Sequence, residues 1–285
     1  YFSIEAREHG ENEAETIETT RYLLTDAIQR QLISDVPRCL FLSGGLDSSI
    51  IVKTAAMYHR ENRMGRVHTY SVEYRDNAEF FQKSLFQPNK DSDYIGLMVK
   101  DADTKHREVI LDNKLLADAL YDSVEARDLP GYADVDSSLL LFCREIKKDY
   151  TVALSGECAD ELFGGYTCYN DPRVFRMYQK IVPHFLRRAI RAICRKLPDI
   201  KGRDYLIRAC DPLEERYIGN AFMYDLREKR AILKDPSIAT APQTHAKKYY
   251  YRCRKQDDVT KMQYLDMNMW MVGDILLKAD RMSMA

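Results

Sequence analysis

The sequence lacks several features that mark other classes of protein. None of its apolar runs approaches the ~20 residues that a membrane-spanning helix needs. The first residues, Tyr1-Phe2-Ser3-Ile4-Glu5, lack the basic and then apolar layout of a signal peptide. The 43 Lys and Arg residues are balanced by 44 Asp and Glu, and this net charge of −1 gives no global reason to expect nucleic acid. We therefore predict a globular protein with neither a membrane nor a nucleic acid as partner.

Cysteine patterns that would indicate a disulfide scaffold or a zinc site are also lacking. The seven cysteines are an odd number, and no two of them have Cys-x-x-Cys spacing. Reduced thiols in a cytoplasmic protein are the expected state. The chain is nevertheless rich enough in apolar residues to fold, because 45% of its 285 residues are hydrophobic. That length allows one large α/β domain or two small ones.

Hydrophobic patterning predicts strands that alternate with helices in the first half of the chain. Strands are expected at 39–42, 67–72, 107–110 and 151–154, and helices at 13–33, 48–59, 93–100, 113–127 and 136–148. Residues 174–230 and 257–285 read as helices, with a loop around 235–242 between them. Such alternation predicts an α/β fold, with a parallel twisted sheet, helices on both faces and a largely helical half after it. Ligands of such sheets bind beyond the carboxyl ends of the strands.

A glycine-rich loop follows the first predicted strand and reads Ser43-Gly44-Gly45-Leu46-Asp47-Ser48-Ser49. Adjacent glycines let the backbone approach a ligand closely, and the N–H groups that open the next helix favour an anion. The loop lacks the Gly-Lys-Ser/Thr ending that grips a γ-phosphate through lysine. The carboxylate of Asp47 would repel phosphate unless a divalent cation lay between them, so the pattern predicts a nucleotide together with Mg²⁺. It resembles the pyrophosphate loop of ATP pyrophosphatases; an ordinary tight turn is the alternative.

A second glycine motif follows the strand predicted at 151–154 and reads Ser155-Gly156-Glu157-Cys158-Ala159-Asp160-Glu161-Leu162-Phe163-Gly164-Gly165-Tyr166. Acidic residues are favoured in the first turn of any helix, which accounts for one or two carboxylates. Three of them, Glu157, Asp160 and Glu161, have spacings that predict one shared helical face.

Together the two motifs resemble the synthetase domain of the glutamine-hydrolysing asparagine synthetase family. The resemblance extends to Ser34-Asp35-Val36-Pro37, to Asp134-Val135-Asp136-Ser137-Ser138 and to the segment 274–285. It implies an adenine nucleotide alpha hydrolase-like fold and a ligase. In that family's reaction, Mg-ATP adenylates the side chain of aspartate and releases pyrophosphate, and ammonia then converts β-aspartyl-AMP to asparagine and AMP.

The resemblance also implies roles for individual residues. The loop Ser43, Gly44, Gly45, Leu46, Asp47, Ser48 and Ser49 would hold the pyrophosphate, and Leu42, Val72, Ser155 and Gly156 would line the AMP moiety. Asp47 and Asp160 would be the carboxylates on the metal side. Glu157 would take a proton from the attacking nitrogen, Glu161 would orient that network, and Lys278 would bind phosphate or the substrate carboxylate. A solvated cation near a helix end is the alternative for Lys278.

The resemblance further implies a domain organisation. Residues 1–12 would be the remnant of an interdomain linker, and 13–285 the synthetase domain, with a sheet core at about 36–166 and a helical part at about 167–285. The family's glutaminase domain, which supplies ammonia from glutamine, would precede this chain, and a lysine-bearing segment would follow it. A homodimer is compatible with the family.

Three points depart from the family or stay open. Cys158 stands where the family commonly has glycine, and a small buried residue is the expected reading. Another amide-forming adenylating enzyme, such as a β-lactam synthetase, and a non-catalytic nucleotide-binding relative are the alternative functions. The basic stretch 184–197 carries an apolar stripe, typical of a surface helix but also of helices that bind membranes, calmodulin-like partners or RNA.

Overall fold

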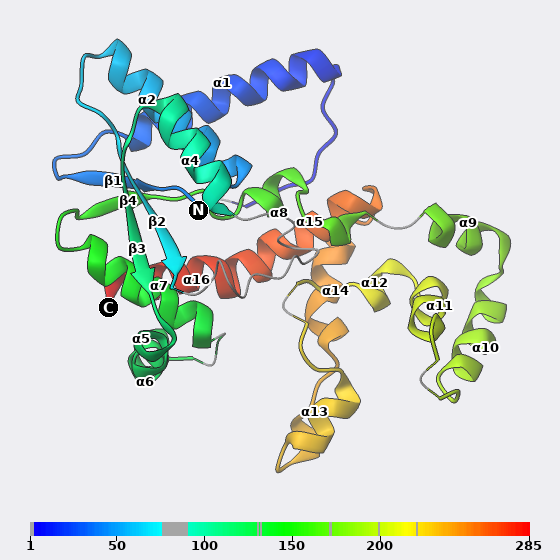
Figure 1. Ribbon diagram of the computed structural model, residues 1–285. Helices are drawn as coiled ribbons and strands as arrows, with labels where there is room; N and C mark the ends of the chain where they lie inside the picture. Colours follow the sequence, from blue (N-terminus) through cyan, green and yellow to red (C-terminus); the bar gives the residue numbers. More distant parts are fainter. Residues whose placement is uncertain are drawn as a thin grey trace. The chain divides into compact units, whose positions relative to one another are not determined.

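The computed structural model describes residues 3–75, 91–129, 131, 133–170, 173–198, 200–220 and 222–285 (Figure 1). The charged stretch after the second strand lies at 76–90, outside these residues, and so does the side chain of Asp134. The chain divides into two compact units. One, here the sheet unit, comprises His9–Glu157 and Leu276–Ala285; the other, here the helical unit, comprises Cys158–Ile275 together with the residues up to Glu8.

The sheet unit alternates strands and helices as expected. Its elements are α1 (Glu13–Gln31), β1 (Arg38–Phe41), α2 (Leu46–Glu61), β2 (His68–Tyr74), α4 (Asp91–Ala102), β3 (Lys105–Leu111), α5 (Asn113–Asp118), α6 (Leu120–Arg127), α7 (Ala133–Ile146), β4 (Val152–Leu154) and α16 (Leu276–Met284). Helix α1 begins where a capping box predicts, because Asn12 and Glu15 satisfy each other's backbone N–H groups at 3.1 and 2.9 Å.

The strands of the described residues form one parallel sheet in the order β3-β2-β1-β4. After β1 the chain builds β2 and β3 on one side, and it then returns to place β4 on the other side of β1. The chain therefore leaves the neighbouring strands β1 and β4 in opposite directions. Open α/β sheets bind ligands at the carboxyl ends of two such strands, where the strand order reverses. Both glycine motifs follow these two strands.

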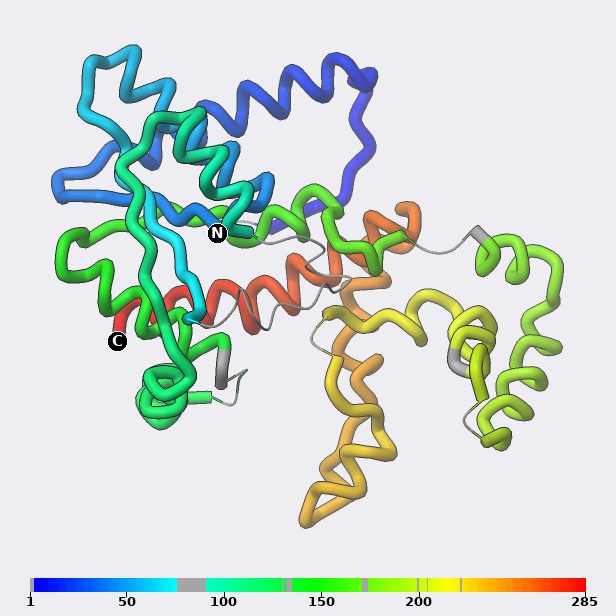
Figure 2. The backbone as a smooth tube through the Cα atoms, in the orientation of Figure 1, coloured from blue at the N-terminus to red at the C-terminus, as the bar shows by residue number. Residues whose placement is uncertain are grey.

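Helices cover both faces of the sheet, as the alternation predicted. Leu40 of β1 packs with Val52 of α2 and Ile95 of α4 on one face. Cys39, the preceding residue, points to the opposite face and packs with Phe142 of α7. This period of two, with apolar residues on both sides, is what a strand buried between two layers requires. Helix α16 packs against α6 and α7, and Figure 2 shows it beside them in red.

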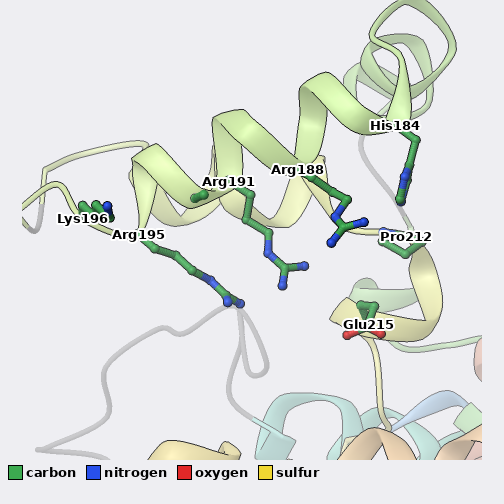
Figure 3. A pocket seen from close by; sticks show the side chains of 8 residues that line it. His184, Arg188, Arg191, Arg195, Lys196, Pro212 and Glu215 are labelled. Atoms are coloured by element: carbon green, nitrogen blue, oxygen red, sulfur yellow. The ribbon is translucent and has the colours of Figure 1, made fainter.

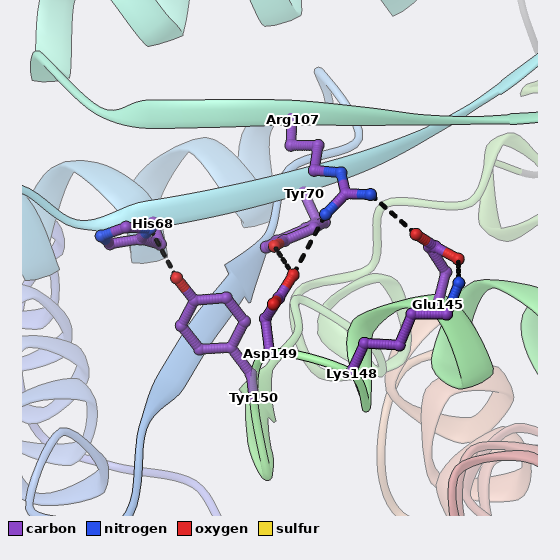
Figure 4. A network of polar contacts seen from close by, with 7 residues as sticks. All are labelled: His68, Tyr70, Arg107, Glu145, Lys148, Asp149 and Tyr150. Atoms are coloured by element: carbon purple, nitrogen blue, oxygen red, sulfur yellow. Dashed lines mark hydrogen bonds and ion pairs between the residues drawn. The ribbon is translucent and has the colours of Figure 1, made fainter.

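A polar network ties the sheet to the segment before β4 (Figure 4). Arg107 of β3 donates to Glu145 at 2.7 Å and to Asp149 at 3.0 Å. The hydroxyl of Tyr150 lies 2.5 Å from Nδ1 of His68 at the start of β2. His68 and Tyr150 lie at the amino ends of their strands, opposite the edge that carries the glycine motifs. The network therefore stabilises the sheet and does not contribute to the edge with the glycine motifs.

A buried ion pair joins α6 to α7. Nη1 of Arg127 lies 2.9 Å from Oδ1 of Asp136, and the two side chains are only 4% and 3% exposed. Gly131 closes over the pair, since a Cβ there would stand 2.5 Å from both Arg127 Nε and Asp136 Oδ2. Asp136, in the middle of the segment Asp134-Val135-Asp136-Ser137-Ser138, therefore supplies a carboxylate that holds two helices together.

The helical unit has no strand among its described residues. Its elements are α8 (Ala159–Phe163), a 3₁₀ turn (Thr167–Tyr169), α9 (Arg173–Ile181), α10 (His184–Cys194), α11 (Arg203–Cys210), α12 (Leu213–Arg216), α13 (Leu226–Ile232), a second 3₁₀ turn (Pro236–Ile238), α14 (Pro242–Arg252), α15 (Asp258–Asn268) and a π-helical segment (Met271–Ile275). No described helix of either unit combines the length and apolar character needed to cross a bilayer.

A buried carboxylate organises the core of the helical unit. Asp266 accepts hydrogen bonds from the hydroxyls of Tyr169, at 2.8 Å, and Tyr217, and from the backbone N–H of Asn220 at 3.1 Å. Burial raises the pKa of Asp266 above its usual value. The predicted helices of 174–230 are present but divided into short pieces, and α14 begins inside the stretch expected to be a loop. Pro242 stands in its first turn, where the missing N–H of proline costs no hydrogen bond.

Candidate active site

The phosphate-loop candidate connects β1 to α2 as a strand, a tight loop and a helix. Leu42 is buried and its N–H extends the ladder to the carbonyl of Tyr70 at 2.8 Å. Gly44 has φ +81°, a conformation that residues with a side chain rarely adopt. A Cβ at Gly44 would also stand 2.7 Å from the carbonyl oxygen of Asp91 at the start of α4. Both the conformation and the space at this position therefore require glycine.

Serine hydroxyls hold the loop in shape. Oγ of Ser43 and Oγ of Ser48 lie 3.1 Å apart, and Ser48 Oγ also accepts from the N–H of Ser43 at 3.2 Å. Ser48 and Ser49 donate to the carbonyl of Gly45 at 3.2 and 2.7 Å. These bonds fold the loop over the first turn of α2.

The start of α2 has the properties of an anion site. No side chain caps this helix, and its first residues include Asp47, which is half-buried. The uncapped N–H groups and the positive end of the helix dipole attract an anion, whereas the Asp47 carboxylate repels one. A cation shared by Asp47 and the anion would resolve this conflict.

The second glycine motif meets this loop inside the sheet unit. It follows β4, which pairs with β1, and Gly156 lies against the first turn of α2. A Cβ on Gly156 would be 2.9 Å from the backbone nitrogen of Ser48 and 3.1 Å from the carbonyl carbon and Cβ of Asp47. The N–H of Glu157 donates to Ser155 Oγ at 3.4 Å, and the Glu157 side chain is exposed. The structure thus brings Gly156 together with Asp47 and Ser48 of the loop, and Ser155 is its neighbour in the chain.

The expectation that Glu157, Asp160 and Glu161 share one helical face is wrong. Helix α8 begins only at Ala159, so Glu157 precedes it. Cys158 lies between them with φ +73°, in the left-handed region, and turns the chain before the helix. This conformation favours glycine, which is a physical reason for glycine at that position. Cys158 itself is half-buried, not fully buried as expected.

Asp160 and Glu161 belong to the helical unit, where their surroundings are well defined. Asp160 is half-buried, and Gly165 approaches it so closely that a Cβ there would collide with Oδ1. Glu161 is 1% exposed; its Oε1 accepts from the hydroxyl of Tyr166 at 2.7 Å. Its Oε2 is buried without a hydrogen-bond partner among the described residues. Nε2 of Gln263 on α15 donates to the carbonyls of Glu161 and Leu162, each at 3.1 Å.

The supporting residues Tyr166 and Gln263 differ in how readily the sequence reveals them. Tyr166 ends the second motif, and burial and its bond to Glu161 raise the pKa of its phenol far above the usual value. Gln263 comes from a helix about a hundred residues later in the chain, and no local sequence signal identifies it.

Val72 and Lys278 lie elsewhere in the sheet unit. The pairing of β1 with β2 ends at Phe41 and Tyr70, so Val72 lies beyond the end of β1, at the carboxyl edge. Its side chain packs into the core on the α7 face, which leaves its backbone as the part available to a ligand. Lys278 is half-buried in the first turn of α16, away from the last turn that favours cations through the dipole.

The donor set suits a magnesium ion carried by a nucleotide. Among the described residues, no three His, Cys, Asp or Glu side chains gather into a cluster that could hold a metal by themselves. Mg²⁺ is commonly bound by one or two carboxylates together with substrate phosphates, so Asp47 beside an anion site fits that mode.

Comparison with known proteins gives the family. The asparagine synthase family model matches residues 19–285. The chain belongs to the asparagine synthase family. Among its relatives, asparagine synthetase [glutamine-hydrolyzing] 3 of Bacillus subtilis is 49% identical over 170 residues, which are 60% of this chain and 28% of that protein.

Two further relatives match nearly the whole chain. Asparagine synthetase [glutamine-hydrolyzing] 1 of Bacillus subtilis is 32% identical over all of this chain and 43% of that protein. A putative asparagine synthetase [glutamine-hydrolyzing] of Mycobacterium tuberculosis is 32% identical over 92% of this chain and 38% of that protein. The chain spans less than half the length of these curated relatives. The resemblance and the ATP pyrophosphatase type of fold are thereby confirmed.

Proposed function

We propose that this asparagine synthase family chain catalyses ATP-dependent formation of asparagine from aspartate. The observation that carries the proposal is the contact of Gly156 with Asp47 and Ser48, which joins the two glycine motifs beside one uncapped helix start. An anion site next to a carboxylate at the switch point of a parallel sheet suits ATP with pyrophosphate as the leaving group. ATP use also follows from membership of the family.

In the proposed first step, the residues from Ser43 to Ser49 bind and orient the phosphates so that the aspartate carboxylate attacks the α-phosphorus. Asp47 and Asp160 would hold Mg²⁺, which when bound neutralises the charge on the departing pyrophosphate. Leu42, Val72, Ser155 and Gly156 would contact the AMP moiety. Lys278 would add a positive charge near phosphate or the substrate carboxylate.

In the proposed second step, ammonia attacks the acyl adenylate and expels AMP. Glu157 would take the proton that the attacking nitrogen loses, and its exposed carboxylate supports this role. Glu161 would orient the groups that carry out this proton transfer, and its buried Oε2, which has no hydrogen-bond partner among the described residues, supports this role. We further propose that ammonia comes from glutamine through a glutaminase domain, as the names of the relatives suggest. The seven free cysteines support a cytoplasmic protein, and a homodimer stays a prediction for light scattering to test.

The test is Mg²⁺-dependent exchange between ATP and pyrophosphate with a panel of amino acids. We expect exchange with aspartate, loss of exchange in Asp47→Ala and Asp160→Ala, and no loss in Glu13→Ala. Glu13 is the matched control because it is an exposed acidic residue in the first turn of α1. A Glu157→Gln variant should keep the exchange but form asparagine slowly.

Other results would count against the proposal. Exchange with a different acid would indicate another amide-forming adenylating enzyme. Absence of exchange with any amino acid, in a protein that binds ATP, would indicate a non-catalytic nucleotide-binding relative.

A further inference from the structure

A second concave site lies in the helical unit, between α10 and α12. In Figure 3, Arg188 and Arg191 of α10, and Arg195 just after it, extend from the same side, with Glu215 of α12 opposite. The cavity has a volume of about 620 Å³. Its lining consists mainly of basic side chains and comprises His184, Arg188, Arg191, Ala192, Arg195, Lys196, Pro212 and Glu215. None of these residues belongs to the two glycine motifs. The volume is in the range of small-molecule sites.

The positive charge of this cavity is only partly compensated. Arg191 forms an ion pair with Asp211, the residue before Pro212. Arg188, Arg195 and Lys196 form no ion pair with any other described residue, and Glu215 is the acidic side chain in the lining. The basic residues that lack an ion pair thus outnumber the acidic residue of the lining.

Helical spacing makes this arrangement costly without a ligand. Arg188 and Arg191 lie on one face of α10, and Arg195, the residue after its end, continues that face in helical conformation; the three are spaced three and four residues apart. Like charges at such spacing destabilise a helix, and an anion among them relieves the repulsion. Guanidinium groups bind phosphate through two parallel hydrogen bonds, which makes arginine the side chain best suited to it.

We propose that this cavity binds a small molecule that carries a polyphosphate group. Arg188 and Arg195 are separated by about 10 Å along the helix axis, so a chain of phosphates suits both better than a single phosphate. The Glu215 carboxylate on the opposite wall suits a ligand whose negative charge is confined to one end, so that a neutral polar group can face this wall. The carboxylate would accept a hydrogen bond from a hydroxyl or amino group of a compact ligand, such as a nucleoside polyphosphate.

Isothermal titration of the full chain with inorganic tripolyphosphate tests the proposal. The variant is Arg188→Ala/Arg195→Ala, and the matched control is Arg227→Ala/Arg230→Ala, which removes two exposed arginines from α13 of the same unit. Both variants keep the phosphate loop, so binding there is common to all titrations. We expect the α10 variant to lose one bound tripolyphosphate, or to weaken that binding event at least about tenfold, and the control to change less than about twofold.

Additional measurements and variants distinguish the possible outcomes. Circular dichroism checks that each variant is folded, and Arg188→Lys/Arg195→Lys, which preserves the charge, should bind with intermediate affinity. Unchanged binding in the α10 variant, or an equal loss in the control, would overturn the proposal. Binding of a single-stranded oligoribonucleotide or of phosphatidylserine vesicles through Arg188 and Arg195, without tripolyphosphate binding, would overturn it in favour of a macromolecular partner. ATP–pyrophosphate exchange should be equal in both variants, which separates this site from the proposed active site.

Discussion

The contact between the two glycine motifs can be tested by adding a single methyl group. Replacing Gly156 with alanine would place a Cβ 2.9 Å from the backbone nitrogen of Ser48 and 3.1 Å from two carbon atoms of Asp47. These neighbours are mostly backbone atoms at the start of a helix, so they cannot turn aside as the tip of a side chain can. Either β4 or the first turn of α2 must shift by a few tenths of an ångström.

The expected cost is that of overpacking a close contact. Such insertions destabilise proteins by about 1–3 kcal/mol. We therefore expect the free energy of unfolding of Gly156→Ala, measured in urea, to fall by that amount. Because the displaced atoms belong to the proposed phosphate site, we also expect the KM for ATP in pyrophosphate exchange to rise at least about tenfold.

A suitable control is Gly65→Ala in the same unit. A methyl group added at Gly65 would have no neighbouring atom within 4 Å, and this residue does not need positive φ. The control should unfold and exchange pyrophosphate like the unaltered chain. If Gly156→Ala matched Gly65→Ala in both assays, Gly156 would not support the loop in the way its contacts indicate. A loss of stability without a change in KM would agree with the close packing of Gly156 but refute its effect on ATP binding.

Four other changes test separate parts of the structure. Gly44→Ala should destabilise the chain by about 1–3 kcal/mol in urea unfolding, since φ is +81°, while Gly45→Ala, at φ −71°, should have little effect. Asp136→Ala should cost about 3–5 kcal/mol in the same assay, because it removes the carboxylate of a buried ion pair with Arg127; a loss below about 1 kcal/mol would refute this. Cys158→Gly should raise the free energy of unfolding by about 1 kcal/mol with exchange unchanged, and a decrease would contradict strain at this residue. Burial lowers the pKa of His106 below its usual 6.5, so His106 binds a proton more readily in the unfolded chain than in the folded one. The free energy of unfolding should therefore fall as the pH drops below 6.5. His106→Gln should reduce this fall, measured by urea titrations at about pH 7.5 and about pH 5.5.

Sequence patterns predicted the central strands of the sheet well. The apolar run 39–42 indicated β1, the β-branched and aromatic residues of 67–72 indicated β2, and the loop between β1 and α2 was recognisable from its glycines and its position after a strand. The second motif was harder. Spacing alone placed Glu157 and Asp160 on one helix, because it carries no information on a left-handed residue between them. Cys158 has a side chain, and nothing in its chemistry indicates φ +73°.

Contacts between distant segments were beyond the reach of sequence patterns. From the sequence, Gly156 is one more glycine of a turn. In the structure its missing side chain leaves space for Asp47 and Ser48, which are more than a hundred residues earlier. Gln263 likewise binds the carbonyls of α8 from another helix. The predicted loop around 235–242 included Pro242, which in the structure is the first residue of α14. Proline breaks helices in their interior but is tolerated in the first turn, so it marks a helix start here.

The same features support the proposal that the two motifs act through the shape of their backbone as well as through their carboxylates. The phosphate loop depends on Gly44, whose missing side chain makes room for α4, and on Gly156, whose missing side chain makes room for α2. Gly165 likewise makes room for Asp160 in the helical unit. At each of these glycines the backbone lies so close to its neighbour that a residue with a side chain would not fit without a shift. We therefore expect alanine at these glycines to impair ATP–pyrophosphate exchange even where every carboxylate is intact, and full exchange in all three variants would show that the carboxylates alone define the site.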